Sequence, residues 1–223
     1  MPALAEPWRP EVNWDTPAGR VLDQLVKALP STRQWKIIVF GSSPLQLGID
    51  SSFLSADVGV IQAADIQEYC RRAKLLKGQT DVYIDLCTAA AFTASADWPV
   101  RAHEVARGHV TFVLPHPIDI LVSKIKRLEQ KDVQAFRMVV AKTGQPTEDE
   151  LIHALRRVVD VYRPNFDEES GSDPRHNTVT LWQELFHKPI NVAQQIIGPA
   201  LEERCKNYGR QGHELRDALR KIM

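Results

Sequence analysis

Two aspartates in apolar surroundings are the residues of this sequence best suited to metal chemistry. Asp57 lies in the run ADVGVI, and Asp85 lies in the run VYIDLC. A carboxylate in a largely buried strand costs free energy unless it is paired, hydrogen-bonded or bound to a cation. Magnesium prefers oxygen ligands and often takes one or two protein carboxylates together with substrate phosphates. Asp57 and Asp85 on neighbouring strands could share a magnesium ion, or they could lie at strand ends capped by backbone groups.

A turn of glycine and serine precedes the first aspartate. Gly41-Ser42-Ser43 follows the apolar run WKIIVF of residues 35–40. A loop that leaves a buried strand in this way can present backbone N–H groups and hydroxyls to a phosphate. Turns of this composition are also common where no ligand binds, so a purely structural role stays open.

Basic side chains follow Pro117. Lys124, Arg127 and Lys131 are spaced i, i+3, i+7 and would share one face of a continuous helix. A solvated basic face is the alternative for Arg127 and Lys131. The basic stretch at 71–77 lacks interleaved aromatic residues, which leaves nucleic-acid binding there as a minor hypothesis.

Sequence patterns predict the elements that carry these residues. β-branched and aromatic runs predict strands at 35–40, 56–61, 81–86 and 109–114. Helical periodicity predicts helices after Pro17, at 64–77, after Pro117 and at 132–141. A capping box, Thr147 with Glu150, predicts a helix that continues through Tyr162. The Gly198-Pro199 and 209–212 interruptions predict two or three short helices at the end of the chain.

These elements predict an α+β fold. We expect a small mixed sheet with flanking helices over residues 1–116 and a helical region over residues 117–223. Trp8 and Trp14, in the segment before the first helix, are expected to pack onto the body of the protein.

Composition narrows the class of protein. The chain has 223 residues, 28 basic and 28 acidic side chains, and 43% hydrophobic residues, which argues against disorder and against a globally basic nucleic-acid binder. Its apolar runs are far shorter than the roughly 20 residues that span a bilayer, and its N-terminus lacks a secretory pattern. Three widely spaced cysteines indicate reduced thiols in a cytoplasmic protein with no membrane role. A homodimer stays open, with no interface specified.

Four segments together resemble the nucleotidyltransferase-fold superfamily, in the branch of small bacterial proteins that includes abortive-infection toxin-type nucleotidyltransferases. They are Val39–Ser43, Ser55–Val60, Tyr83–Leu86, and Ile118–Arg127 with Lys131-Asp132. The likeness covers residues 35–140. It implies that the Gly-Ser turn holds nucleotide phosphates, and that two acids at i and i+2 of one strand, plus a third on a later strand, bind two metal ions.

The resemblance assigns roles to individual residues. Gly41, Ser42 and Ser43 would form the phosphate turn, and a lysine at the position of Lys124 would face the cleft and contact a triphosphate. Asp57 would be the first carboxylate and Asp85 the third. Gly59 stands where the second carboxylate is expected, because residues i and i+2 point to the same face of a strand.

Two functions therefore remain as hypotheses. The first is a nucleotidyltransferase that binds a nucleoside triphosphate with magnesium and transfers a nucleotidyl group to a protein or RNA acceptor. The second is a catalytically degenerate protein of the same fold that serves as a nucleotide sensor or a protein-interaction module. The glycine at position 59 motivates the second, since two-metal transfer needs the missing acid.

Overall fold

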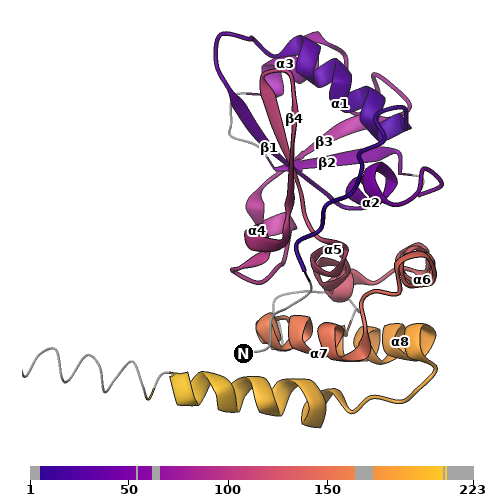
Figure 1. Ribbon diagram of the computed structural model, residues 1–223, viewed down its shortest axis with the longest axis vertical. Helices are drawn as coiled ribbons and strands as arrows, with labels where there is room; N and C mark the ends of the chain where they lie inside the picture. The colour runs from indigo at the N-terminus through magenta and orange to yellow at the C-terminus, as the bar shows by residue number, and fades with distance from the viewer. Residues whose placement is uncertain (1–5, 54, 62–65, 164–172, 208, 210–223) are drawn as a thin grey trace, which may run out of the picture.

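The computed structural model describes residues 6–53, 55–61, 66–163, 173–207 and 209, and its centre is a mixed β-sheet (Figure 1). The sheet has the order β3-β2-β1-β5-β4. Its strands are β1 (Trp35–Phe40), β2 (Asp57–Ile61), β3 (Tyr83–Cys87), β4 (His103–Arg107) and β5 (Val110–Leu114). This arrangement, with flanking helices and a helical C-terminal part, confirms the predicted α+β class.

Strand pairing fixes which residues lie side by side. β1 pairs in parallel with β5, and β2 pairs in parallel with β3, whereas β1 with β2 and β4 with β5 are antiparallel. Phe40 is the partner of Gly59 across β1 and β2, and Gly59 is the partner of Asp85 across β2 and β3. These three residues form one row across the sheet.

One face of the sheet is apolar and covered by helices. Helices α1 (Pro17–Ala28) and α3 (Gln67–Arg72) lie on this face (Figure 1). Alternate strand residues point into this core because side chains alternate between the two faces of a strand: Trp35, Ile37, Val39, Val58, Val60, Ile84, Val110, Phe112 and Leu114. The other face carries Asp57, Gly59 and Asp85.

The helical C-terminal part has its own apolar core. Its elements are α5 (Pro117–Lys124), a 3₁₀ turn (Ile125–Arg127), α6 (Gln130–Thr143), α7 (Glu148–Arg157), a 3₁₀ turn (Val159–Tyr162) and α8 (Pro174–Phe186). Leu45 and Phe53, which precede β2, also pack in this core. None of the helices in the described part of the chain is long and apolar enough to cross a membrane.

The predicted starts of α1, α5 and α7 are confirmed, and two predicted helix ends are wrong. Thr16 caps α1, and Thr147 with Glu150 forms the capping box of α7. Helix α7, however, ends at Arg157, and a 3₁₀ turn rather than an α-helix leads to Tyr162. Helix α3 ends at Arg72, because Leu76 pairs with Ile84 at the start of β3 instead of continuing the helix.

The sequence patterns did not predict β4. This strand lies at the edge of the sheet, and most of its side chains are exposed, so it lacks the apolar alternation of a half-buried strand. Short helices elsewhere in this half of the chain are α2 (Ser43–Gly48), a 3₁₀ turn (Ala89–Ala91) and α4 (Trp98–Arg101).

Gly198-Pro199 does not interrupt the last described helix. Residues 192–207 form one helix that contains a π-helical turn, Ala193–Ile197, just before Pro199. Pro199 has no N–H to donate to the carbonyl oxygen of Gln195 four residues earlier. Arg156 donates to that oxygen instead, from Nε at 2.9 Å and from Nη2 at 2.7 Å. A guanidinium group thus replaces the lost hydrogen bond. Of the 209–212 interruption, only Gly209 is among the described residues, and it is helical.

Both N-terminal tryptophans pack onto the body, as expected. Trp8 lies against Gly48, where an added Cβ would come within 2.6 Å of its ring, and Trp14 contacts Phe112 with ring centroids 5.8 Å apart. The backbone N–H of Trp8 also donates to the carbonyl oxygen of Arg101 at 3.1 Å. The segment from Trp8 to Trp14 is therefore fixed along the body of the protein.

Candidate functional site

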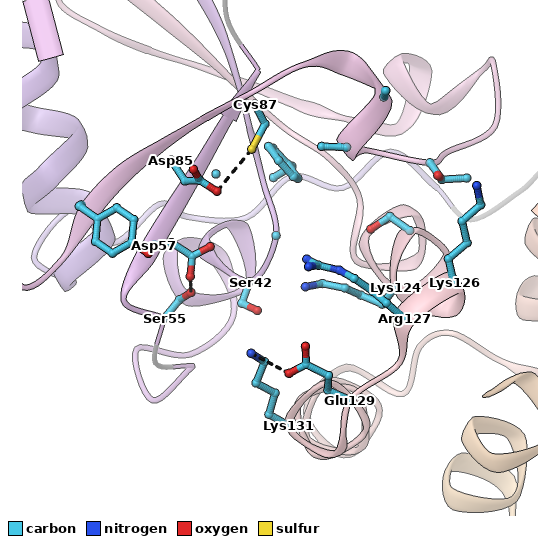
Figure 2. A pocket seen from close by; sticks show the side chains of 18 residues that line it. Ser42, Ser55, Asp57, Asp85, Cys87, Lys124, Lys126, Arg127, Glu129 and Lys131 are labelled. Carbon is cyan, nitrogen blue, oxygen red and sulfur yellow. Dashed lines mark hydrogen bonds and ion pairs between the residues drawn. The ribbon is translucent and has the colours of Figure 1, made fainter. Parts of the chain in front are cut away.

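A cleft of about 720 Å³ lies between the open face of the sheet and the start of the helical part. Its sheet wall carries Asp57 and Asp85, and its helical wall carries basic side chains, as Figure 2 shows. Gly41 and Ser42, in the turn after β1, also line the cleft. The volume is within the range of small-molecule sites, about 300–1,000 Å³.

The two aspartates point to the same face because of strand register. Asp57 and Asp85 lie on adjacent parallel strands. Asp85 is opposite Gly59, two residues after Asp57, so the two aspartates lie on the same face of the sheet, diagonal to each other. Asp57 accepts a hydrogen bond from Ser55 Oγ at 3.0 Å, and Asp85 accepts one from Cys87 Sγ at 3.4 Å. Both residues are exposed to the cleft. Each carboxylate keeps further lone pairs for a cation.

The turn after β1 depends on glycine. Gly41 has a φ of +78°, a backbone conformation that glycine adopts without steric cost. Ser42 follows as the N-cap of α2 and lines the cleft. Ser43 is buried, and its hydroxyl donates to the carbonyl oxygen of Asp57 at 3.3 Å. Ser43 therefore ties the turn to the start of β2, and its hydroxyl does not line the cleft.

An aromatic ring occupies the space beside Gly59. A Cβ atom added at Gly59 would lie 3.0 Å from Cε1 of Phe40, the partner residue on β1. The Phe40 ring packs against Phe92, with centroids 6.0 Å apart, and Phe92 packs against Trp98 at 5.3 Å. The resemblance expects a second carboxylate at this position. The ring of Phe40, which packs against Phe92, covers it.

The basic residues of the helical wall do not share one continuous helix face. Helix α5 ends at Lys124, a 3₁₀ turn follows, and α6 begins at Gln130, so the predicted i, i+3, i+7 geometry is wrong. The cleft nevertheless brings Lys124, Arg127 and Lys131 together, and Lys126 joins them. The turn between α5 and α6, rather than one continuous helix, brings these basic side chains to the same cleft.

Two of these lysines already have carboxylate partners. Lys124 Nζ lies 3.4 Å from Asp132 Oδ1, and both side chains are almost fully buried. Lys131 Nζ lies 2.9 Å from Glu129 Oε2 at the exposed rim. This hydrogen bond raises the pKa of Lys131 and lowers the pKa of Glu129. Asp132 also accepts the backbone N–H of Glu129 at 3.2 Å, which closes the capping box of α6.

Several residues of the cleft could not be recognised from the sequence. Phe40, Lys126 and Glu129 line it, and so does Cys87, two residues after Asp85 on the same face of β3. For Cys87, the period-two alternation of a strand was the available signal. Burial raises the pKa of Cys87 to about 11, and the hydrogen bond to Asp85 acts in the same direction. The thiol is therefore protonated at neutral pH and a poor nucleophile.

The donors present suit one hard cation better than two. Asp57 and Asp85 offer carboxylate oxygens, which magnesium accepts alongside water and phosphate. Within the described residues, no group of three or more His, Cys, Asp or Glu side chains gathers where a metal ion could bind. Asp50, in the loop before β2, pairs with Lys142 and does not join the two cleft aspartates.

Comparison with known proteins gives one family match. No curated protein matches the chain, and no solved structure matches it. A family model described as "Nucleotidyltransferase of unknown function (DUF6036)" matches residues 20–142, which is more than half of the chain. The matched range contains the Gly-Ser turn, both cleft aspartates and the basic helical wall. The chain therefore belongs to this family of nucleotidyltransferases of unknown function.

Proposed function

We propose that this protein binds a nucleoside triphosphate with magnesium and transfers a nucleotidyl group to a protein or RNA acceptor. One observation carries the proposal: two carboxylates face a basic wall across one cleft that a Gly-Ser turn also lines. Carboxylates suit a metal ion, whereas cations and free backbone N–H groups suit phosphates. Membership of a nucleotidyltransferase family supports the same substrate class.

Each residue then has a separate task. Asp57 and Asp85 would hold the metal ion, which when bound would neutralise phosphate charge and activate the attacking oxygen. Gly41, Ser42 and the backbone N–H of Ser43 would bind phosphate oxygens. Lys124 would approach the same phosphates from the helical wall.

The biological setting belongs to the same proposal. We propose a bacterial protein of the abortive-infection toxin type that acts in the cytoplasm, where its cysteines stay reduced. The cysteines at 70, 87 and 205 are free, in keeping with a reducing compartment.

Isotope transfer tests the proposed activity. Purified protein with magnesium and α-³²P-labelled nucleoside triphosphates should label itself or an acceptor in a cell extract. Asp57→Asn keeps the hydrogen bond from Ser55 but removes the charge, so labelling should fall at least about a hundredfold, since the metal ion loses one of two carboxylates. Asp81→Asn, an exposed acid outside the cleft, is the matched control and should label normally. Equal labelling by the Asp57 variant would refute the proposal.

The packing of Phe40 on Gly59 favours a second candidate. With the second carboxylate site filled by an aromatic ring, the protein would retain nucleotide binding and lack transfer, as a sensor or interaction module. Calorimetry and the labelling assay together separate the two candidates. Magnesium-dependent triphosphate binding without any label transfer supports the sensor, whereas brisk turnover by the unmodified protein rules it out.

A further inference from the structure

The cations of the helical wall differ in whether a carboxylate already offsets their charge. Lys124 is paired with Asp132 at 3.4 Å, and Lys131 is paired with Glu129 at 2.9 Å. Arg127, in the turn between α5 and α6, makes no ion pair or hydrogen bond to any residue that the structure describes. It is therefore a cation held at a cleft without a counter-charge.

Arg127 also extends toward the centre of the cleft. Figure 2 shows its side chain pointing toward the side of the cleft where Ser42 lies, as that of Lys124 does, while the side chain of Lys126 extends in another direction. The charge of Arg127 acts on groups around it. It opposes the burial that raises the pKa of Cys87 on the sheet wall, and it adds to the effect of Lys131 in lowering the pKa of Glu129.

Charge balance indicates what this arginine would bind. A divalent cation held by Asp57 and Asp85 would offset those two carboxylates. Lys126 and Arg127 would then be the described cations lining the cleft that lack a partner. A ligand that balances these two cations must bring at least two negative charges. A triphosphate meets this requirement, and a neutral or singly charged ligand does not.

We infer that Arg127 is a further substrate-contacting residue of this cleft, and that its guanidinium group binds phosphate oxygens of the nucleotide. This inference rests on the proposed function. The planar fork of a guanidinium group can donate two parallel hydrogen bonds, from two nitrogen atoms, to two oxygens of one phosphate, a geometry that the single nitrogen atom of a lysine does not offer. Lys124, already neutralised by Asp132, contributes a contact but little net charge.

Binding of inorganic tripolyphosphate without magnesium tests Arg127 separately from the metal site. Calorimetric titration of the full chain should show binding that Arg127→Gln weakens about tenfold or more, as expected when a charge-assisted hydrogen bond is lost. Arg127→Lys should recover only part of this loss. Lys77→Gln removes one exposed positive charge outside the cleft and should change the affinity less than twofold.

Melting temperatures distinguish a binding role from a folding role. Arg127→Gln should melt as the wild type does, because the side chain is exposed and unpaired within the described structure. Lys124→Gln should melt lower, because it leaves Asp132 buried without its partner.

The results distinguish the inference about Arg127 from the proposal of a metal site at Asp57 and Asp85. Unchanged tripolyphosphate affinity in Arg127→Gln, or no binding by the wild type, overturns the inference about Arg127. Tripolyphosphate binding that depends on Arg127, together with magnesium–ATP binding that is indifferent to Asp57→Asn, supports the inference and removes the proposed metal site.

Discussion

Phe40 explains why restoring a single acid would not rebuild a second metal site. A Cβ at position 59 would lie 3.0 to 3.2 Å from three atoms of the Phe40 ring, and Phe92 limits the movement of that ring. We expect Gly59→Asp alone to lower the free energy of unfolding by roughly 1–3 kcal/mol through overpacking, with no gain in magnesium affinity. Phe40→Ala combined with Gly59→Asp should raise magnesium affinity, because a third carboxylate then joins Asp57 and Asp85. Isothermal titration with Mg²⁺ or Mn²⁺ measures both variants.

The matched control for this pair is Phe40→Ala with Gly59→Asn. It has nearly the same shape as the acidic double variant and lacks the charge, so its magnesium affinity should stay at the wild-type level. If Gly59→Asp alone binds magnesium as tightly as the double variant, the Phe40 ring is not the obstacle.

At the scale of residues, the sequence identified side chains that alternate along strands and missed those brought in by tertiary packing. Asp57 and Asp85 were visible as acids in apolar runs, and the structure brings them to one cleft. Phe40 looked like the last apolar residue of a buried strand, but it faces the cleft side. The pairing of Lys124 with Asp132 depends on how the turn after α5 folds back, which spacing along one helix does not predict.

A buried ion pair joins α4 to α5. Arg101 donates to both carboxylate oxygens of Asp119, from Nε at 3.1 Å and from Nη2 at 2.7 Å, and both side chains are almost fully buried. Arg101 Nη2 also donates to Ser95 at 2.8 Å. Helix α4 precedes the edge strand β4, and α5 begins the helical part, so the pair ties the sheet to the helices.

Asp119→Asn should therefore destabilise the protein strongly. Removing one partner leaves the buried guanidinium without its main counter-charge, which costs about 3–5 kcal/mol. Urea denaturation followed by circular dichroism would measure this loss. Asp23→Asn removes an acid that pairs with Arg107 at the surface and should cost about 1 kcal/mol or less. Similar losses in the two variants would show that burial does not govern the strength of the Arg101 pair.

At the scale of elements, local signals predicted starts better than ends. Thr16 and Thr147 act through short-range hydrogen bonds that the sequence displays directly. The end of α3 and the edge strand β4 depend on pairing with distant strands. The helix through Pro199 persists because Arg156, nearly forty residues earlier, supplies a donor to the free carbonyl oxygen, about which the local sequence carries no information.

For the whole molecule, the fold class was predictable, and the division of the chain stays a proposal. The order of strands and helices predicted an α+β protein with a helical C-terminal part. We propose a sheet domain over residues 1–116 and a helical domain over 117–223. Leu45 and Phe53 of the first pack in the core of the second, so the two share apolar packing across the boundary.

His116 lies at that boundary and couples folding to pH. It is 3% exposed, it accepts the backbone N–H of Ile118 through Nδ1 at 3.1 Å, and its ring contacts Trp8. Burial, and then the nearby charge of Arg101, lowers the pKa of His116 from its ordinary value of 6.5 to about 4. Between these two values the unfolded chain binds a proton that the folded protein does not. The stability of the fold therefore falls as the pH decreases through this window.

The expected size of this effect follows from the two pKa values. Between about pH 7 and about pH 5, His116 should reduce the free energy of unfolding by about 2 kcal/mol. His116→Asn keeps an acceptor for Ile118 and cannot titrate, so its stability should change less over the same range, whatever its stability at neutral pH. Urea denaturation of both proteins at the two pH values gives the difference. His103→Asn is the control, since His103 is more exposed and its pKa is lowered less. If wild type and His116→Asn lose equal stability on acidification, His116 does not carry the pH dependence of folding.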